Sequence, residues 1–306
     1  MSADARKTSP PEAAEPTAPL RRKIKKLEVM IADVIRETPD SATLVLFTGN
    51  DQLEYRPGHF LTIDPHQFPA LERFIEYFEE MKGKREPARA YSLASAPHEK
   101  YLAITVKEEY YISGRTKYPP LLSPLLVWRM QPGTRMVVTG FGGPYVLPTD
   151  IESRTDHLVH VCAGSGIVPN WSIIKHSLAE DLQLRHTLVY GNKTFEDIIF
   201  RRQVEALQRQ HPDRVQVVHA LSREQEVHRY GEAFQPGRVD RAVIQSAIPD
   251  PSAAVVFACG PGIGKWERLA AKESGTDPQP RFLESALAAL EEIGVPKAQI
   301  HHESYG

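Results

Sequence analysis

The hydrophobic positions follow two different patterns along the chain. From about residue 24 to 150 the apolar runs are short, and turn residues such as Pro, Gly, Asn and Asp separate them. Short strand-like runs with regular turns are typical of an antiparallel sandwich or barrel. The runs read LEVMIADVI, ATLVLF, HFLTI, YLAITV and RMVVTG.

One insertion, near 66–86, interrupts this pattern. Its segment PALERFIEYFEEMKGK places Leu71, Phe74, Ile75 and Phe78 at spacings of three and four residues. Such spacing gathers the four side chains on one face and predicts an amphipathic helix. The helix can cap the barrel, cover a bound cofactor or dock a partner, and the pattern leaves these interpretations open.

From about residue 156 onward, strand-like runs alternate with helical stretches. The runs HLVHVCAGSG, HTLVYGN, RVQVVHALSR and AAVVFACGPG are nearly continuous in apolar residues. Alternation of this kind predicts βα units and a parallel sheet covered on both faces. The helical candidates lie near 169–181, 194–210, 239–247, 262–273 and 281–293.

The change of pattern predicts two domains, which also suits a length of 306 residues. We place a barrel domain at 23–152 and an α/β domain at 153–306. Residues 1–22, rich in Pro, Ala, Ser and charge, are interpreted as a disordered tail. The basic run from Arg21 to Lys26 is either the solvated start of a strand or an edge that attracts an acidic partner.

Composition excludes several classes of protein. A formal net charge of −2 gives no indication of nucleic-acid binding. The two cysteines, Cys162 and Cys259, are too few for the thiolate set of a common iron–sulfur cluster. No apolar run suits a membrane span and no secretory signal is visible, so a cytoplasmic protein is expected. The pair His301 and His302 lacks companions at ligand spacing, so no metal site is predicted.

Glycine-rich turns follow two of the predicted parallel strands. Ligands of such sheets bind beyond the carboxyl ends of the strands. The first strand runs into Gly164, Ser165 and Gly166, and Pro169 suits the first position of the following helix. A helix start of this kind can bind a pyrophosphate, although a plain tight turn would look the same. Another strand ends in Cys259, Gly260 and Pro261, where Cys259 is either an inert core residue or faces a ligand.

Two further groups of residues carry charge or hydroxyl chemistry at strand ends. Ser222 and Arg223 could hold a phosphate monoester, or Arg223 could be an ordinary surface residue. In Arg89-Ala90-Tyr91-Ser92, strand alternation puts Arg89 and Tyr91 on one face and Ser92 on the other. A cation beside an aromatic ring suits a ligand with a phosphate and a flat ring, but an edge strand with an exposed Arg89 and a packed Tyr91 would have the same sequence.

The order of these motifs resembles the ferredoxin–NADP reductase superfamily of flavoproteins, over roughly residues 27–306. The motifs are Pro57-Gly58-His59-Phe60, Arg89-Ala90-Tyr91-Ser92, Gly164 to Pro169, Val189-Tyr190-Gly191-Asn192, Cys259-Gly260-Pro261 and Glu303-Ser304-Tyr305. The resemblance implies a six-stranded antiparallel flavin barrel followed by an NAD(P)-binding domain with a parallel sheet.

For the flavin, the resemblance implies that Arg89 binds its phosphate, that Tyr91 lies against the isoalloxazine and that the Ser92 hydroxyl reaches N5. The form RxYSLAS favours FAD over FMN. The family's second phosphate motif, G-x-x-S/T, is represented by Ser123 alone, because its glycine is absent. That departure weakens the choice between FAD and FMN.

For the nucleotide, the resemblance implies that the turn from Gly164 to Pro169 holds the pyrophosphate and that Cys259 lies beside the nicotinamide. Ser222 and Arg223 resemble the pair that binds a 2′-phosphate, which favours NADPH over NADH. Glu303 and Tyr305 resemble the carboxylate and terminal aromatic near the flavin of plant-type members. Here Gly306 follows the tyrosine, which departs from the family pattern.

The implied function is an FAD-dependent NAD(P)H reductase with Ser92, Cys259 and Glu303 as catalytic residues. Hydride passes from NADPH to flavin, and electrons then pass to a separate acceptor such as a ferredoxin or an oxygenase component. The chain resembles oxygenase reductases that lack a fused iron–sulfur domain. Two alternatives stay open: a reductase of ferric chelates or free flavins, and a non-catalytic regulatory module that binds NADPH or flavin.

Overall fold

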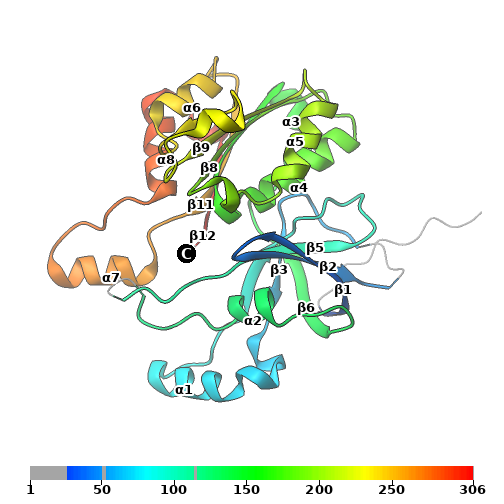
Figure 1. The fold of residues 1–306 in the computed structure, drawn as a ribbon, viewed down its shortest axis with the longest axis vertical. Helices are drawn as coiled ribbons and strands as arrows, with labels where there is room; N and C mark the ends of the chain where they lie inside the picture. The colour runs from blue at the N-terminus through cyan, green and yellow to red at the C-terminus, as the bar shows by residue number, and fades with distance from the viewer. Residues whose placement is uncertain (1–25, 50–52, 114–115, 306) are drawn as a thin grey trace, which may run out of the picture.

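The computed structural model describes residues 26–49, 53–113 and 116–305. The predicted tail at 1–22 and all of the basic run except Lys26 lie outside the described residues, as does Gly306. Figure 1 shows two β-sheet regions, one curled into a barrel and one flanked by helices. The prediction of an antiparallel region followed by a parallel α/β region is confirmed.

The first region is a six-stranded antiparallel barrel with strand order β4-β3-β6-β1-β2-β5. Leu93, directly after β4, pairs with Ile104 of β5 and thereby joins the two edge strands. Alternate residues of the strands point inward, so Ile31, Leu44, Leu61 and Ile104 form a core that water does not reach. The strands are β1 (Lys26–Thr38), β2 (Ser41–Phe47), β3 (Phe60–Ile63), β4 (Arg89–Ser92), β5 (Leu102–Lys107) and β6 (Arg135–Gly142).

The insertion contains the predicted helix, α1 (Glu72–Lys82), after two short 3₁₀ turns at Pro65–Gln67 and Pro69–Leu71. Ile75 and Phe78 are buried, as the spacing predicts. Phe74 is 59% exposed, so its assignment to the packed face is wrong. The packed stripe is therefore narrower than the sequence suggested and consists of Leu71, Ile75 and Phe78.

The second region is a six-stranded parallel sheet with strand order β10-β9-β8-β7-β11-β12. Two of its strands, β10 and β12, were not predicted. Strand β10 has three residues, and IHHESY of β12 is largely polar, so neither has the apolar pattern of a buried strand. The strands are β7 (His157–Ala163), β8 (Arg185–Asn192), β9 (Val215–Leu221), β10 (Phe234–Pro236), β11 (Val255–Pro261) and β12 (Ile300–Tyr305).

Helices cover both faces of this sheet, which explains its continuous apolar strands. Side chains of α4 and α5 pack in one hydrophobic core, and those of α6 and α8 pack in another. Helix α7 lies apart from both, at the left of Figure 1. The helices are α4 (Ile167–Ala179), α5 (Arg201–Gln210), α6 (Arg241–Ala247), α7 (Lys265–Ser274) and α8 (Phe282–Glu292), with short helices α2 (Ser123–Trp128) and α3 (Ile151–Arg154).

The segment that joins the two sheets runs from the end of β6 to the start of β7. It contains Tyr145, which is 2% exposed and packs edge-on against Phe257 of β11. The predicted domain boundary at 152/153 falls within α3 and stays a prediction. Among the described residues, no helix is long and apolar enough to cross a membrane.

Candidate active site

The parallel sheet has a topological switch point between β7 and β11. From β7 the chain adds β8, β9 and β10 on one side, and then returns to add β11 and β12 on the other. The carboxyl ends of β7 and β11 are therefore neighbours from which the chain departs in opposite directions, which is where open α/β sheets bind ligands. Both predicted glycine-rich turns lie at these two ends.

The turn from Gly164 to Pro169 needs glycine at two positions, for a positive φ at Gly164 and for a close backbone contact at Gly166. Gly164 has a φ of +54°, and the space where a Cβ would lie is open. A Cβ on Gly166 would lie 2.1 Å from the Cys259 carbonyl oxygen, so only glycine permits this approach to β11. Pro169 is the third residue of α4 and not its first, because the 3₁₀ turn Gly164–Gly166 runs directly into the helix at Ile167.

Cys259 is fully buried in β11, where its strand neighbours are Cys162 in β7 and Glu303 in β12. Burial raises the pKa of the Cys259 thiol well above its usual value, with the nearby Glu303 carboxylate acting in the same direction. The thiol is therefore neutral. A Cβ on Gly260 would lie 2.5 Å from the ring of Phe282, so this turn too depends on close packing.

Three predicted residues from the two sheets meet directly. The Tyr305 hydroxyl donates to Ser92 Oγ at 2.5 Å, and the Ser92 hydroxyl donates to Glu303 Oε2 at 3.4 Å. Ser92 belongs to the barrel strand β4, whereas Glu303 and Tyr305 belong to β12 of the parallel sheet. The side chain of Tyr305 also packs against the cluster that contains Cys259, so it lies between Ser92 and the end of β11.

Burial controls the protonation of this group. It raises the pKa of Glu303 to about 7, although the hydrogen bond from Ser92 partly opposes the shift. Burial also raises the pKa of the Tyr305 hydroxyl well above its usual value, helped by Cys259 and Glu303, so Tyr305 stays protonated and donates. Glu303 can therefore hold or release a proton near neutral pH.

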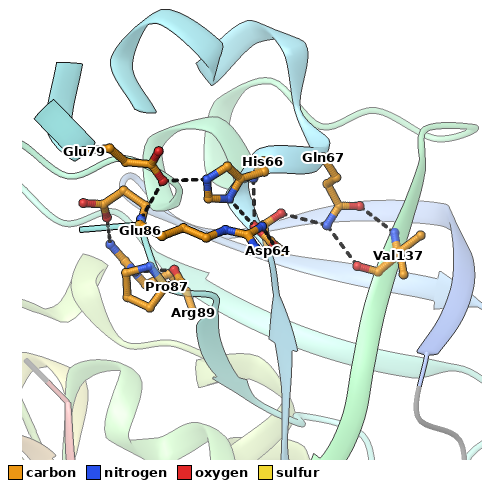
Figure 2. A network of polar contacts seen from close by, with 9 residues as sticks. Asp64, His66, Gln67, Glu79, Glu86, Pro87, Arg89 and Val137 are labelled. Atoms are coloured by element: carbon orange, nitrogen blue, oxygen red, sulfur yellow. Dashed lines mark hydrogen bonds and ion pairs between the residues drawn. The ribbon is translucent and has the colours of Figure 1, made fainter. Parts of the chain in front are cut away.

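Arg89 is held by the insertion, as Figure 2 shows. Its Nη2 donates to Glu86 Oε2 at 2.7 Å and its Nη1 donates to the Pro87 carbonyl oxygen at 2.5 Å. The Glu86 side chain is only 1% exposed and also pairs with Lys82. Burial alone would raise the pKa of Glu86, but hydrogen bonds and charge from Lys82 and Arg89 outweigh it and lower that pKa.

The same network fastens the insertion to the barrel (Figure 2). Glu79 accepts the backbone N–H of Glu86 at 2.8 Å and contacts His66 Nε2 at 2.8 Å. On its other side His66 Nδ1 lies 2.6 Å from Asp64 Oδ1. The insertion thus contributes directly to where the guanidinium of Arg89 lies, which the sequence did not reveal.

The remaining flavin candidates lie on or near the same barrel. Tyr91 is half-buried opposite Leu61 of β3, two residues from Arg89, as strand alternation predicts. Ala90 is exposed between them. Ser123 is buried at the start of α2, and its Oγ accepts the backbone N–H of Glu109 at 3.1 Å. Ser123 therefore organises the loop between β5 and α2.

Ser222 and Arg223 follow β9, at the carboxyl edge of the parallel sheet. The backbone N–H and hydroxyl of Ser222 both donate to the Asn192 carbonyl oxygen, at 3.0 and 3.2 Å. Arg223 is exposed, and its guanidinium makes none of the side-chain hydrogen bonds or ion pairs found within the described residues. It is placed where it can meet a ligand that approaches the strand ends.

Asn192 is a residue to which sequence reasoning assigned no role. It ends β8, is 8% exposed, and neither its Oδ1 nor its Nδ2 finds a hydrogen-bond partner in the part of the chain that the structure describes. Buried amides normally have partners. The sequence signal that could have identified Asn192 was a polar residue at the end of a buried parallel strand.

Two cavities, of about 440 and 430 Å³, lie elsewhere between the two regions and contain none of the predicted site residues. At the site itself, the Tyr305 side chain lies against Ser92 and against the cluster that contains Cys259. Within residues 26–49, 53–113 and 116–305, no cluster of His, Cys, Asp and Glu is arranged to hold a metal ion.

Known proteins share both the site-bearing domain and the whole fold. Residues 160–263 match the family model described as an oxidoreductase NAD-binding domain. The cytochrome b5 reductase domain of Ulva prolifera nitrate reductase superposes with a TM-score of 0.69 at 20% identity, covering 94% of this chain and 100% of that one. A Plasmodium falciparum ferredoxin–NADP⁺ reductase solved with 2′P-AMP gives 0.63 at 18%, covering 93% and 100%. The chain shares the two-domain fold of these reductases.

Sequence relatives agree with this class. The ferredoxin reductase component of a Mycobacterium tuberculosis 3-ketosteroid-9-alpha-monooxygenase is 31% identical over 289 residues, covering 91% of this chain and 65% of the relative. A ferredoxin–NADP reductase of Thermosynechococcus vestitus is 26% identical, covering 92% and 78%. In sequence and fold the chain is similar to ferredoxin reductase components and ferredoxin–NADP reductases. It spans only 65% of the length of the monooxygenase component.

Proposed function

We propose that the protein is an FAD-dependent NADPH oxidoreductase that passes electrons to a separate acceptor. The observation that carries the proposal is the direct contact of Ser92 with Glu303 and Tyr305. This contact places Ser92 of the barrel strand β4 against β12 of the parallel sheet. A reductase needs its two cofactor sites to meet at one point, and these residues mark where they meet.

The residues present fit both cofactors. The open space at Gly164 and the close approach of Gly166 to β11 leave a turn that a pyrophosphate can enter. The unsatisfied amide of Asn192 and the exposed Arg223 lie at the same edge and suit a polar nucleotide. On the barrel, Arg89 supplies a cation and Tyr91 a half-buried ring.

When both cofactors are bound, they supply the hydride transfer from nicotinamide to flavin. The chain's own part is to bind the two rings, orient them and exclude water. Placement of two reacting groups is worth on the order of 7–11 kcal/mol in good model reactions. Ser92, which bridges Tyr305 and Glu303, is the residue best placed to hold that geometry.

Glu303 is proposed to accept and release the proton that accompanies electron transfer. Its carboxyl has a pKa of about 7 and accepts a hydrogen bond from Ser92. Near neutral pH it can therefore take up or give a proton at Oε2, with the Ser92 hydroxyl as the adjacent donor. Cys259, which is neutral and buried, is proposed to form the apolar side of the site that contains Ser92, Glu303 and Tyr305.

The preference for NADPH rests on Ser222 and Arg223. A guanidinium binds a phosphate monoester in a bidentate way, and Arg223 is exposed at the strand end. The separate acceptor, a ferredoxin or an oxygenase component, is inferred from relatives named as ferredoxin reductase components and ferredoxin–NADP reductase. FAD is preferred over FMN on the RxYSLAS form of Arg89 to Ser95.

The test is a visible spectrum of the purified protein, before and after reconstitution with FAD or FMN, followed by anaerobic addition of NADPH or NADH. The proposal predicts a bound flavin that bleaches faster with NADPH than with NADH. Equal bleaching would keep the reductase and remove the 2′-phosphate argument. Failure to bind either flavin would contradict the proposal and favour a nucleotide-binding module.

A further inference from the structure

A buried asparagine lies directly behind the proposed pyrophosphate turn. Asn170 is the fourth residue of α4 and has no solvent exposure. Its Nδ2 donates to the Gly166 carbonyl oxygen at 2.8 Å. On its other side, Oδ1 accepts the Tyr145 hydroxyl at 3.0 Å and lies 2.8 Å from His160 Nδ1. One of the amide's partners, the Gly166 carbonyl oxygen, belongs to the turn.

These partners fix the orientation of the amide. Only the NH₂ end can donate to a carbonyl oxygen, so Oδ1 must face Tyr145 and His160. His160 Nδ1 must then carry a hydrogen, which leaves its Nε2 to accept from His186 Nδ1 at 3.1 Å. Burial lowers the pKa of His160 to about 4 and that of His186 well below its usual value, so both rings are neutral. The chain of hydrogen bonds has one arrangement.

We propose that Asn170 is a positioning residue for the pyrophosphate of the bound dinucleotide. By holding the Gly166 carbonyl oxygen, it fixes the peptide at which the 3₁₀ turn becomes α4. The direction of that peptide sets the direction of the first N–H groups of the helix, which are the anion-binding groups of such turns. This inference rests on the proposed function, since it assigns a role within the nucleotide site.

The same amide connects the turn to the segment between the two sheets. Tyr145 belongs to that segment and is itself fully packed against Phe257 of β11. A purely apolar side chain would fill the space behind α4 without the cost of burying polar groups. The buried hydrogen bonds of Asn170 thus fix the direction of the Gly166 carbonyl group, which apolar packing would not do.

The main test is Asn170→Asp, which keeps the size and the acceptor but removes the donor to Gly166. The variant and wild type are loaded with flavin, and NADP⁺ binding is measured by calorimetry. At about pH 8.5 the carboxylate faces a carbonyl oxygen to which it cannot donate, so we expect the affinity for NADP⁺ to fall about tenfold, as for the loss of one buried hydrogen bond. With NADPH and a small dye as acceptor, KM should rise while kcat changes little, since the turn holds ground and transition states alike.

A pH profile separates positioning from general destabilisation. Toward about pH 6 the buried carboxyl of the variant takes up a proton and regains a donor, so the ratio of variant to wild-type Kd should shrink. The ratio is used because Glu303 also titrates in this range. The titratable and charged groups that face position 170 or its partners are Tyr145, His157, His160, Cys162, His186, Arg214, Cys259 and Glu303.

Two further variants complete the experiment. Ser177→Ala removes a buried hydroxyl that donates to the Ile173 carbonyl oxygen on the same helix, away from the turn. It should leave the Kd for NADP⁺ unchanged. Tyr145→Phe removes one of the two donors to Oδ1 and should weaken NADP⁺ binding about twofold to threefold, since His160 still holds the amide. That variant keeps the inference testable if Asn170→Asp does not fold.

The outcomes are distinguishable. A pH-dependent loss of NADP⁺ affinity in Asn170→Asp, with flavin content unchanged, supports the inference. An unchanged Kd, a ratio that is the same at every pH, or a fall in kcat with KM unchanged overturns it. If Asn170→Asp is unfolded, an unchanged Kd in Tyr145→Phe overturns it. If wild type binds flavin but neither NADP⁺ nor NAD⁺, the proposed function fails, and the inference with it.

Discussion

The two places proposed to bind phosphate are built in opposite ways. The turn from Gly164 to Pro169 is shaped by glycines and by neutral, buried hydrogen bonds that end at Asn170. Arg89 is instead held by charged residues of the insertion, several of them open to solvent. A site set by backbone fit should resist changes of salt and pH, whereas a site set by ion pairs should respond to both.

The largest effect expected is from Gly166→Ala. The added Cβ would lie 2.1 Å from the Cys259 carbonyl oxygen, and backbone cannot move aside as a flexible side chain can. We expect a loss of about 1–3 kcal/mol of unfolding free energy, the usual range for overpacking, or failure to fold. Denaturant unfolding measures this, together with NADP⁺ affinity.

Gly164→Ala is the matched control for that substitution. Its φ of +54° is unfavourable for alanine, but its Cβ meets no atom within 4 Å. The cost should therefore be limited to the backbone, about 1 kcal/mol. A loss as large as that of Gly166→Ala would show that close approach to β11 is not what fixes the turn.

The next effect concerns Arg89→Ala. A charge-assisted hydrogen bond to phosphate contributes about 1.5–3 kcal/mol, so flavin affinity should fall roughly 10- to 150-fold. The affinity of wild type for flavin should also weaken as salt rises. Titration of the apoproteins with flavin at several salt concentrations measures both the loss of affinity in the variant and the salt dependence of wild type.

Arg85→Ala is the control for charge alone. Arg85 is 68% exposed and pairs with Asp64 in the same network. Its loss should leave flavin affinity nearly unchanged. Equal losses in the two variants would mean that the network attracts the flavin only through its overall charge.

An effect of similar size, but confined to neutral and alkaline pH, is expected from Glu303→Gln. Burial raises the folded-state pKa of Glu303 to about 7 from a usual 4.5. The folded state therefore binds this proton more tightly, so wild-type stability falls as pH rises from the unfolded to the folded pKa. The variant should be more stable than wild type at about pH 8, by on the order of 2–3 kcal/mol, and equal to it at about pH 4.5. Unfolding curves across this range check the sign, which an equal difference at both ends would contradict.

The smallest effect is expected from His66. Hydrogen bonds to Asp64 and Glu79 raise its pKa. The stability that the protonated ring contributes is present below the usual pKa of His and is lost as pH rises through the raised value. Because the ring and both carboxylates are partly exposed, His66→Asn should change the melting temperature slightly at low pH and not at high pH. An effect confined to high pH would contradict the sign.

The same contrast explains what the sequence could predict. The parallel strands and the glycine turns carry their signals locally, because continuous apolar runs and tight backbone approaches need particular residues. The position of Arg89 could not be foreseen, since its partner Glu86, which also pairs with Lys82, belongs to an insertion whose docking is a tertiary contact. Strand β12 was missed because an edge strand with IHHESY has no apolar period.

Other errors have equally local causes. Pro169 was expected to open α4, but the 3₁₀ turn before it lets the helix begin at Ile167. Phe74 was assigned to the buried face of α1 and is exposed, because the buried stripe runs through Leu71, Ile75 and Phe78 and leaves Phe74 at its edge. The meeting of Ser92 with Glu303 and Tyr305 joins residues over 200 positions apart, and only the resemblance to a family pointed toward it.

The most direct test of the account is anaerobic stopped-flow reduction of the flavin-loaded protein by NADPH, in wild type and Ser92→Ala. The claim is that the two cofactor sites meet at Ser92. We expect wild type to bleach rapidly, and Ser92→Ala to bleach at least about tenfold more slowly with unchanged flavin and NADP⁺ affinities. Equal rates in the two proteins would contradict the claim.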